Sequence, residues 1–324
     1  MYATATATTR YTDRHANLRD AGFYRTVFDL AVSTLGIGTY LNASVDALLA
    51  AAENGINFFD AAINYRHQQS ERDMAAALQQ LQRDEIVVCT KAGFLTPGAI
   101  PDFLKSDDVV ANMHSMSPEF LEHQIERSRA NLGVDTIDVF YLHNPETQLA
   151  YRTPEDFDAG IRRAFARLER LADEQKIRWY GCATWDGFRQ PGQLKLPRLA
   201  EIAAEEGGAD HHFRFIQLPF NLGMVEAYVG KPESVLAQAA RLGVAVIASA
   251  SLLQTRVLEH MPDAVADLLP GLDTAAQRAI QFTRSTPGIS VALVGMGSSE
   301  HVLENLGVGR VPPATPEQYR RLYR

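Results

Sequence analysis

The sequence is poor in cysteine, in long apolar runs and in basic residues, and each shortage excludes a class of protein. Its 324 residues include only Cys89 and Cys182, both inside apolar runs, which excludes a disulfide scaffold and indicates a reducing, cytoplasmic compartment. No apolar stretch approaches the roughly 18 residues of a membrane-spanning helix. Lysine and arginine number 31 against 39 aspartate and glutamate, so the formal net charge is −8. We therefore expect neither nucleic acid nor a membrane surface as a partner.

The chain does contain a regular alternation of apolar runs and amphipathic stretches. Eight runs rich in Ile, Val, Phe and Tyr lack polar alternation, which is typical of parallel strands buried on both faces. They cover residues 34–40, 56–60, 86–91, 137–143, 177–184, 213–220, 244–251 and 289–295. Hydroxyl-Pro-Glu triplets at 117–119, 153–155 and 315–317 indicate helix starts, and Gly55, Gly133 and Gly243 indicate helix ends. The pattern predicts an α/β fold, a single-domain (β/α)8 TIM barrel.

The main alternative is an open doubly wound sheet, which would carry a G-x-G-x-x-G turn after an early strand. The early Gly36-Ile37-Gly38 lacks the third glycine, so the barrel is preferred. We expect residues 24–324 to form it and the Ala/Thr-rich residues 1–23 to be a poorly ordered tail. Residues 92–117 are a long connection of the kind that forms a lid, a specificity loop or a partly disordered segment.

Three consecutive predicted strands end in reactive side chains, namely Asp60, Lys91 and His143, and Tyr65 follows the first of them. In such barrels the carboxyl ends of the strands meet at one mouth. A buried Lys91 ammonium would favour the Tyr65 phenolate and lower its pKa, with Asp60 balancing the lysine charge. His143 would orient a carbonyl oxygen. A tuned tyrosine of this kind suits carbonyl reduction, although a single charged residue at a strand end is more often a solvated rim residue.

From about Leu35 to Leu306 the sequence resembles the aldo-keto reductases. The markers are Gly36-Ile37-Gly38-Thr39, residues 55–62 with Tyr65, Ser70-Glu71, Thr90-Lys91-Ala92-Gly93, Leu132-Gly133-Val134-Asp135, Tyr141-Leu142-His143, Lys176-Ile177-Arg178 before Gly181, Gly295-Met296-Gly297 and Glu304-Asn305. The resemblance implies a (β/α)8 barrel that reduces carbonyls with a nicotinamide cofactor. It also implies a catalytic tetrad, matched by Asp60, Tyr65, Lys91 and His143, with Tyr65 as the general acid.

The resemblance further implies a dinucleotide site, with NADP(H) preferred over NAD(H). Family members commonly carry Gly-x-Ser-Asn after the fifth strand, where this chain has Gly181-Cys182-Ala183-Thr184, and the usual stacking aromatic after the seventh strand is missing. Between Gly295 and Asn305 the only candidate base for a 2′-phosphate is His301. The expected cofactor-binding residues are Gly38, Thr39, Asp60, Thr184, Gln217, Ser249, Ser251, Leu252, Gly295, Gly297, His301, Glu304 and Asn305.

The expected partner is a small-molecule aldehyde or ketone, sugar-like carbonyls included, bound by Tyr40, Arg66, His143 and Trp185. Arg66 can be read as a surface-loop residue or as a source of positive potential for anionic substrates. The other histidines, His114 among them, lack metal-ligand spacing, are interpreted as incidental and predict no metal site. Two alternatives stay open: a cofactor-assisted epimerase or lyase, and a regulatory cofactor-binding subunit with little turnover. The sequence leaves the oligomeric state open.

Overall fold

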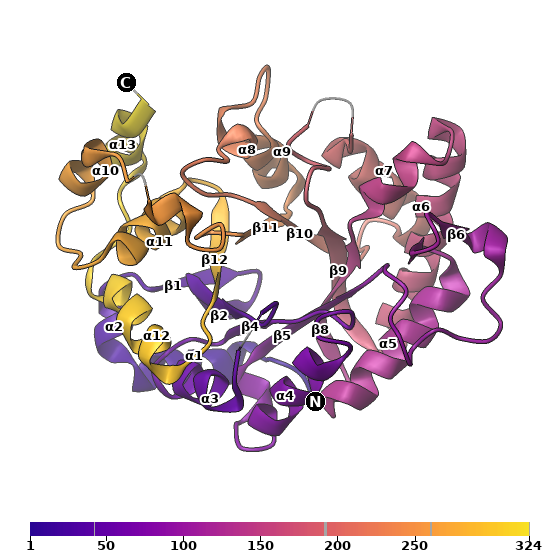
Figure 1. Cartoon of the computed structure of the whole chain (residues 1–324), viewed down its shortest axis with the longest axis horizontal. Helices are drawn as coiled ribbons and strands as arrows, with labels where there is room; N and C mark the ends of the chain where they lie inside the picture. The colour runs from indigo at the N-terminus through magenta and orange to yellow at the C-terminus, as the bar shows by residue number, and fades with distance from the viewer. Residues whose placement is uncertain (42, 191–192, 260, 324) are drawn as a thin grey trace.

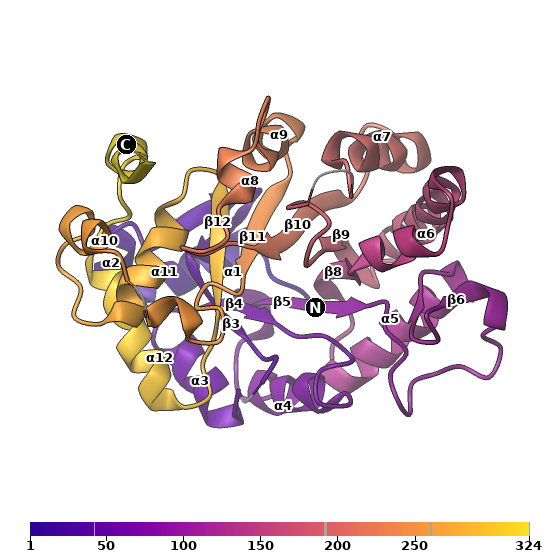
Figure 2. The same ribbon diagram turned by 45° about the horizontal axis from the view of Figure 1, so that its top comes forward.

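The computed structural model describes residues 1–41, 43–190, 193–259 and 261–323. Figures 1 and 2 show its strands gathered at the centre with the helices around them. The strands form a closed barrel in the order β10-β11-β12-β3-β4-β5-β8-β9, and every neighbouring pair in it is parallel. The predicted (β/α)8 barrel is therefore confirmed.

The barrel strands lie close to the predicted runs. They are β3 (Leu35–Gly38), β4 (Phe58–Asp60), β5 (Val87–Ala92), β8 (Ile137–His143), β9 (Ile177–Ala183), β10 (Phe213–Pro219), β11 (Ala245–Ser249) and β12 (Ile289–Gly295). All residues of β4 and β5 are buried. Burying a large aliphatic or aromatic side chain contributes about 1.5–3 kcal/mol, so these continuous apolar runs are most stable between other layers of the fold.

Helices cover the outside of the barrel. They are α3 (Val45–Glu53), α4 (Gln69–Leu78), α5 (Pro118–Leu132), α6 (Pro154–Asp173), α7 (Leu196–Gly207), α8 (Glu226–Val229), α9 (Val235–Leu242), α10 (Asp263–Leu268), α11 (Ala275–Ser285), α12 (Ser299–Asn305) and α13 (Pro316–Arg320). The predicted start signals are confirmed, since α5, α6 and α13 each begin at the proline of a hydroxyl-Pro-Glu triplet. Gly133 ends α5 at a φ of 65°, a left-handed conformation that glycine adopts without a Cβ clash.

A short hairpin closes the amino end of the barrel. Strands β1 (Tyr24–Val27) and β2 (Leu30–Ser33) pair antiparallel, and Val27, Leu30 and Val32 join the apolar cluster inside the barrel. The Phe28 ring at its tip lies 5.3 Å from Trp179 and 5.4 Å from Phe215, near the starts of β9 and β10. The carboxyl end of the barrel is left open as the mouth.

The N-terminal residues differ from the expected disordered tail. They form α1 (Ala5–Arg14) and α2 (Ala16–Asp20), and Ala3, Ala7 and Tyr11 are buried at steps of four residues. Tyr11 donates a hydrogen bond of 2.6 Å to the Ala52 carbonyl, and Arg10 pairs with Glu85. The four-residue spacing of Ala3, Ala7 and Tyr11 is the helical signal in this segment, and the surrounding alternation of Ala and Thr obscures it.

The long connection over residues 92–117 is folded. It contains a 3-10 turn (Ser106–Asp108) and the two-stranded pair β6 (Val109–Val110) and β7 (His114–Ser115). Further 3-10 turns are Arg83–Glu85, Pro145–Ala150, Arg256–Leu258, Leu306–Arg310 and Arg321–Tyr323. None of the helices in the described part of the chain combines the length and apolar character that a membrane span requires.

Candidate active site at the barrel mouth

The ends of β4 and β5 bring an acid and a base together inside the mouth. Lys91 Nζ lies 2.6 Å from Asp60 Oδ2 and donates to the Ala61 carbonyl at 2.8 Å. The two side chains are 1% and 5% exposed. An unpaired charge at this depth would be strongly destabilising, so the Lys91 ammonium and the Asp60 carboxylate stabilise each other. Burial opposes the Lys91 ammonium, but Asp60 and Tyr65 outweigh it and raise the pKa of Lys91.

Tyr65 and His143 complete the cluster. The Tyr65 hydroxyl lies 3.5 Å from Lys91 Nζ, and its ring meets the His143 ring edge-on at a centroid distance of 5.8 Å. Burial raises the pKa of Tyr65, while Lys91 lowers it by a smaller amount. The expected net lowering is therefore wrong for this structure, since loss of hydration outweighs the ammonium. Burial, followed by the Lys91 charge, lowers the pKa of His143 well below its usual value, so its ring is neutral.

Surrounding polar groups fix the acid and the lysine. Gln217 Nε2 donates to Asp60 Oδ1 at 2.9 Å, and the Thr39 hydroxyl donates to the Asp60 carbonyl at 3.0 Å. Glu71 is fully buried and accepts from Thr90, the residue before Lys91, at 2.7 Å. The Ser70-Glu71 marker therefore braces β5 from α4.

The residues expected to hold a dinucleotide are distributed around the rest of the mouth. Strand pairing places Gly295 beside Gly38, Ser249 beside Pro219 and Gln217 beside Ala183. Thr184 lies within hydrogen-bond distance of the Gln217 carbonyl, at 3.4 Å. Other expected residues differ in exposure: Leu252 and Gly297 are half-buried, His301 and Glu304 are exposed, and Asn305 is buried.

Ser251 is the observation that best fits a bound dinucleotide. Its side chain is 1% exposed, and its hydroxyl forms no hydrogen bond within the described residues. A buried hydroxyl without a partner is costly, and a phosphate or ribose oxygen would satisfy it. The backbone around it is left-handed at several non-glycine residues, since Ala250 and residues 253–255 have φ values between 44° and 71°. The residues present are thus compatible with the cofactor that the resemblance implies.

The expected substrate residues are only partly assembled. The Tyr40 ring packs edge-on against Tyr65 at 5.0 Å and is 55% exposed, and Trp185 is 47% exposed. Arg66 Nη2 lies 2.8 Å from Asp73 Oδ2. That carboxylate offsets the guanidinium charge, whereas Nε and Nη2 of Arg66 are buried without a hydrogen bond among the described residues, so both interpretations of Arg66 stay predictions.

Two polar residues at the mouth, the half-buried Glu146 and the buried His114, are not predicted as site residues from the sequence. Glu146 Oε1 accepts from the backbone N–H groups of Trp185, Asp186 and Gly187 at 2.7, 3.1 and 3.2 Å, and so ties the chain after β9 to the end of β8. His114 Nε2 lies 2.8 Å from the His143 carbonyl oxygen. Neither residue belongs to a motif, and only the fold brings them to the mouth.

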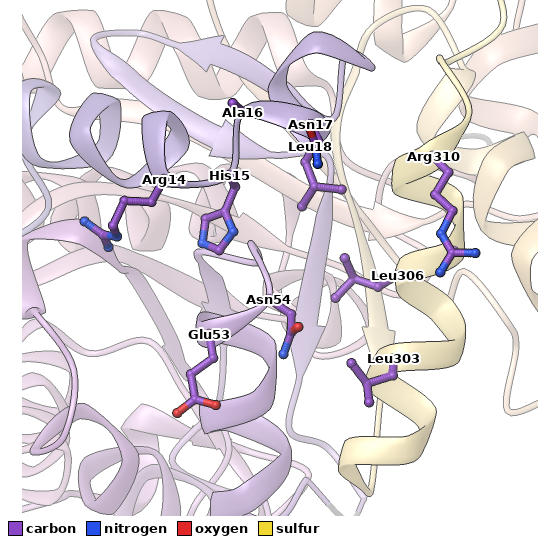
Figure 3. A pocket seen from close by; sticks show the side chains of 11 residues that line it. Arg14, His15, Ala16, Asn17, Leu18, Glu53, Asn54, Leu303, Leu306 and Arg310 are labelled. Carbon is purple, nitrogen blue, oxygen red and sulfur yellow. The ribbon is translucent and has the colours of Figure 1, made fainter.

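A cleft lies at the opposite end of the barrel from the mouth. It has a volume of about 540 Å³ and lies between the N-terminal helices and α12. Figure 3 shows Arg14, His15 and Leu18 on one side and Leu306 and Arg310 on the other. The C-terminal end of α3 also lines it, which places it away from the mouth. No group of three or more His, Cys, Asp or Glu suited to a metal lies among the described residues.

The fold and the site together define a (β/α)8 barrel protein with a cluster of Tyr, Lys, Asp and His at its mouth. The aldo/keto reductase family model matches residues 34–262, and the chain belongs to that family. The resemblance stated from the sequence is confirmed.

Curated relatives include an NADH-specific methylglyoxal reductase of Escherichia coli (strain K12), 29% identical over 52% of this chain and 55% of its own length. A D-threo-aldose 1-dehydrogenase of Pseudomonas sp is 32% identical over 47% and 50%. The chain therefore matches about half the length of these relatives. A putative voltage-gated potassium channel subunit beta of Schizosaccharomyces pombe (strain 972 / ATCC 24843) is 24% identical over 98% and 95%.

Solved structures support the fold. An aldo-keto reductase from Bacillus halodurans in its holo form matches with a TM-score of 0.67 and 20% identity, over 93% of this chain and 95% of that one. One from Klebsiella pneumoniae in complex with NADP and acetate also has a TM-score of 0.67, with 21% identity over the same shares. At these identities the likeness extends to the fold alone.

Proposed function

We propose that this protein is an NAD(P)H-dependent oxidoreductase that reduces a small aldehyde or ketone to the alcohol. The observation that carries the proposal is the buried line from Asp60 through Lys91 to the Tyr65 hydroxyl, with the neutral His143 ring beside it. This arrangement can deliver one proton to an oxygen that becomes negative, which is the protein's part in carbonyl reduction.

Each residue of the proposed tetrad has a separate task. Tyr65, kept protonated by its raised pKa, donates its phenolic proton to the carbonyl oxygen while the carbonyl carbon accepts a hydride. Lys91 stabilises the phenolate that remains, and Asp60 fixes Lys91. The neutral His143 orients the carbonyl oxygen. A reduced nicotinamide, when bound, would supply the hydride and become oxidised, and solvent would return a proton to Tyr65.

The residues proposed to hold the dinucleotide are those expected from the sequence. Among them, the contacts described above bear most directly on Ser251, Thr184 and Gln217. We keep NADP(H) over NAD(H) as the proposed coenzyme, supported by the family resemblance. Against it stand the lack of Lys and Arg over residues 295–305 and a relative whose name specifies NADH. Titration with NADPH and NADH, followed by fluorescence quenching, decides between them, and tighter NADH binding would reverse the proposed preference.

A Tyr65→Phe variant tests the assignment of the acid. We expect it to lose turnover of methylglyoxal and of an aldose panel by about 100-fold or more, because the proton donor is removed. Its affinity for NADPH should stay within about twofold, because the Tyr65 ring stays in place and the hydroxyl that is removed is assigned to the carbonyl oxygen and not to the dinucleotide. Tyr141→Phe is the matched control, since its buried hydroxyl forms no hydrogen bond among the described residues and its removal should leave turnover unchanged. Persistent turnover in Tyr65→Phe would refute the role of Tyr65.

A regulatory cofactor-binding subunit is the second candidate. It is favoured by the channel beta-subunit relative, which aligns with nearly the whole chain. The assembled Tyr65–Lys91 contact favours the enzyme. Stoichiometric oxidation of NADPH or NADH by a carbonyl would decide for the enzyme, and would also exclude an epimerase or lyase without net redox. The cytoplasmic location stays a prediction.

A further inference from the structure

The long connection after β5 places His114 against the main chain of His143. The segment folds back on itself: Ser115 N donates to the Gly93 carbonyl at 2.8 Å, and Leu95 N donates to the Met113 carbonyl at 2.7 Å. His114, on β7, is fully buried by this fold. The sequence interpretation of this histidine as incidental does not anticipate this position.

The hydrogen bonds around His114 allow only one arrangement of its protons. The His143 carbonyl can only accept, so His114 Nε2, 2.8 Å away, must carry the hydrogen. Gln148 Nε2 lies 2.9 Å from His114 Nδ1 and 3.4 Å from the His114 carbonyl, and it donates to both. Nδ1 is thus an acceptor, and the imidazole is neutral with its proton on Nε2.

This contact is made to the carbonyl of the last residue of β8. Pairing between β5 and β8 ends at Ala92 and Leu142, so His143 lies one residue beyond it. On the other side of β8, Ala183 is the strand partner of His143, and its carbonyl accepts from Asn144 N at 2.6 Å. The His114 side chain therefore binds β8 one residue beyond the point where its pairing with β5 ends.

Packing around this hydrogen bond is close. The Phe94 ring lies edge-on between the two imidazoles, 5.2 Å from His114 and 5.1 Å from His143. A Cβ at position 93 would lie 2.6 Å from both His114 Nε2 and the His143 carbonyl oxygen, so only glycine fits there. The Gly93 of the family marker thus leaves room for the histidine to reach the strand end.

We propose that His114 is a positioning residue for His143, and that residues 92–117 serve to deliver it. This inference rests on the proposed function, in which His143 orients the carbonyl oxygen. The Nε2–H group fixes the His143 main chain, and Phe94 fixes the ring. A displacement of about 1 Å at a reacting group can lower turnover about 100-fold, which is why such an anchor matters.

The experiment compares two replacements of the same histidine. His114→Gln keeps an N–H donor near the position of Nε2, whereas His114→Phe keeps the aromatic contact with Phe94 and removes the donor. With methylglyoxal, we expect His114→Phe to lower kcat about 10- to 100-fold and His114→Gln to stay within about fivefold of wild type. NADPH affinity should not move in either variant. His211→Gln, in the connection before the start of β10 and so at the amino end of the barrel, is the control for loss of a histidine.

The two replacements separate positioning from folding. Equal losses of kcat in His114→Phe and His114→Gln, or full activity of His114→Phe, would overturn the inference. If His114→Phe fails to fold, Gln148→Met replaces it: this variant frees Nδ1 and should lower kcat with a smaller effect on the melting temperature.

A readout without turnover keeps the inference distinct from the proposed function. Imidazole ¹⁵N NMR of the wild-type protein should place the His114 proton on Nε2 at neutral pH, and the His143 signals should shift in His114→Phe but match wild type in His114→Gln. A His114 proton on Nδ1, or unshifted His143 signals in His114→Phe, would overturn the inference even in an inactive protein. Absence of turnover with every carbonyl would overturn only the proposed function.

Discussion

The two halves of the barrel mouth are built differently. At the ends of β4 and β5 the Asp60 and Lys91 side chains are held by hydrogen bonds, as the three contacts of Lys91 illustrate, whereas His143 Nδ1 at the end of β8 forms none among the described residues. At the ends of β11 and β12 the buried Ser251 hydroxyl has no hydrogen bond among the described residues, and Gly295 is exposed. The line from Asp60 through Lys91 to Tyr65 organises the first half before any ligand arrives, whereas the second half has no such line and leaves the Ser251 hydroxyl for a ligand to satisfy.

The largest effect should come from breaking the organised half at Lys91. In Lys91→Met we expect kcat to fall by at least about 100-fold, because the Tyr65 phenolate loses its stabilising charge. The Asp60 carboxylate would be left buried without its ion, which should lower the free energy of unfolding by about 3–5 kcal/mol. Steady-state kinetics and urea unfolding measure the two effects.

A second variant separates those effects. Lys91→Met combined with Asp60→Leu should recover most of the lost stability, because no buried charge remains, and should stay inactive. If the single variant were as stable as wild type, the ion pair would not organise this half of the mouth.

The organised half should also respond to acid through His114. Burial lowers the pKa of His114 to about 4 from a usual value of 6.5. Between these values the unfolded chain binds the proton and the folded protein does not, so stability is complete above pH 6.5 and falls as the pH falls. The total loss is about 3 kcal/mol, of which about 2 kcal/mol appears by pH 5. His143, whose pKa is also lowered, adds to the loss in the same direction.

Urea unfolding at a series of pH values checks this dependence. His114→Gln cannot take up the proton and should lose about 2 kcal/mol less than wild type between pH 7 and pH 5. Identical pH slopes for the two proteins would show that His114 is accessible to protons in the folded state.

The sequence predicts the tetrad because each member stands at or just after the end of an apolar run. Asp60, Lys91 and His143 are the last or nearly the last residues of β4, β5 and β8, so locating the strands locates the side chains. His114 and Glu146 could not be found in this way, since their partners are backbone atoms of other segments. The α1 helix was missed because its small buried residues give a weak apolar signal.

The smallest effect on stability should come from Ser251→Ala, in the half of the mouth at the ends of β11 and β12. The variant removes a buried hydroxyl that has no hydrogen bond among the described residues, so the free energy of unfolding should change by less than about 0.5 kcal/mol or rise slightly. If a dinucleotide oxygen completes this hydroxyl, as the proposed function requires, affinity for NADPH should fall about 5- to 10-fold, the value of one hydrogen bond. Fluorescence quenching gives the affinity, and urea unfolding without nucleotide gives the stability. A loss of stability with unchanged affinity would reverse the contrast, because Ser251 would then belong to the organised part of the fold. Unchanged stability with weakened binding would establish that this half of the mouth depends on its ligand for completion.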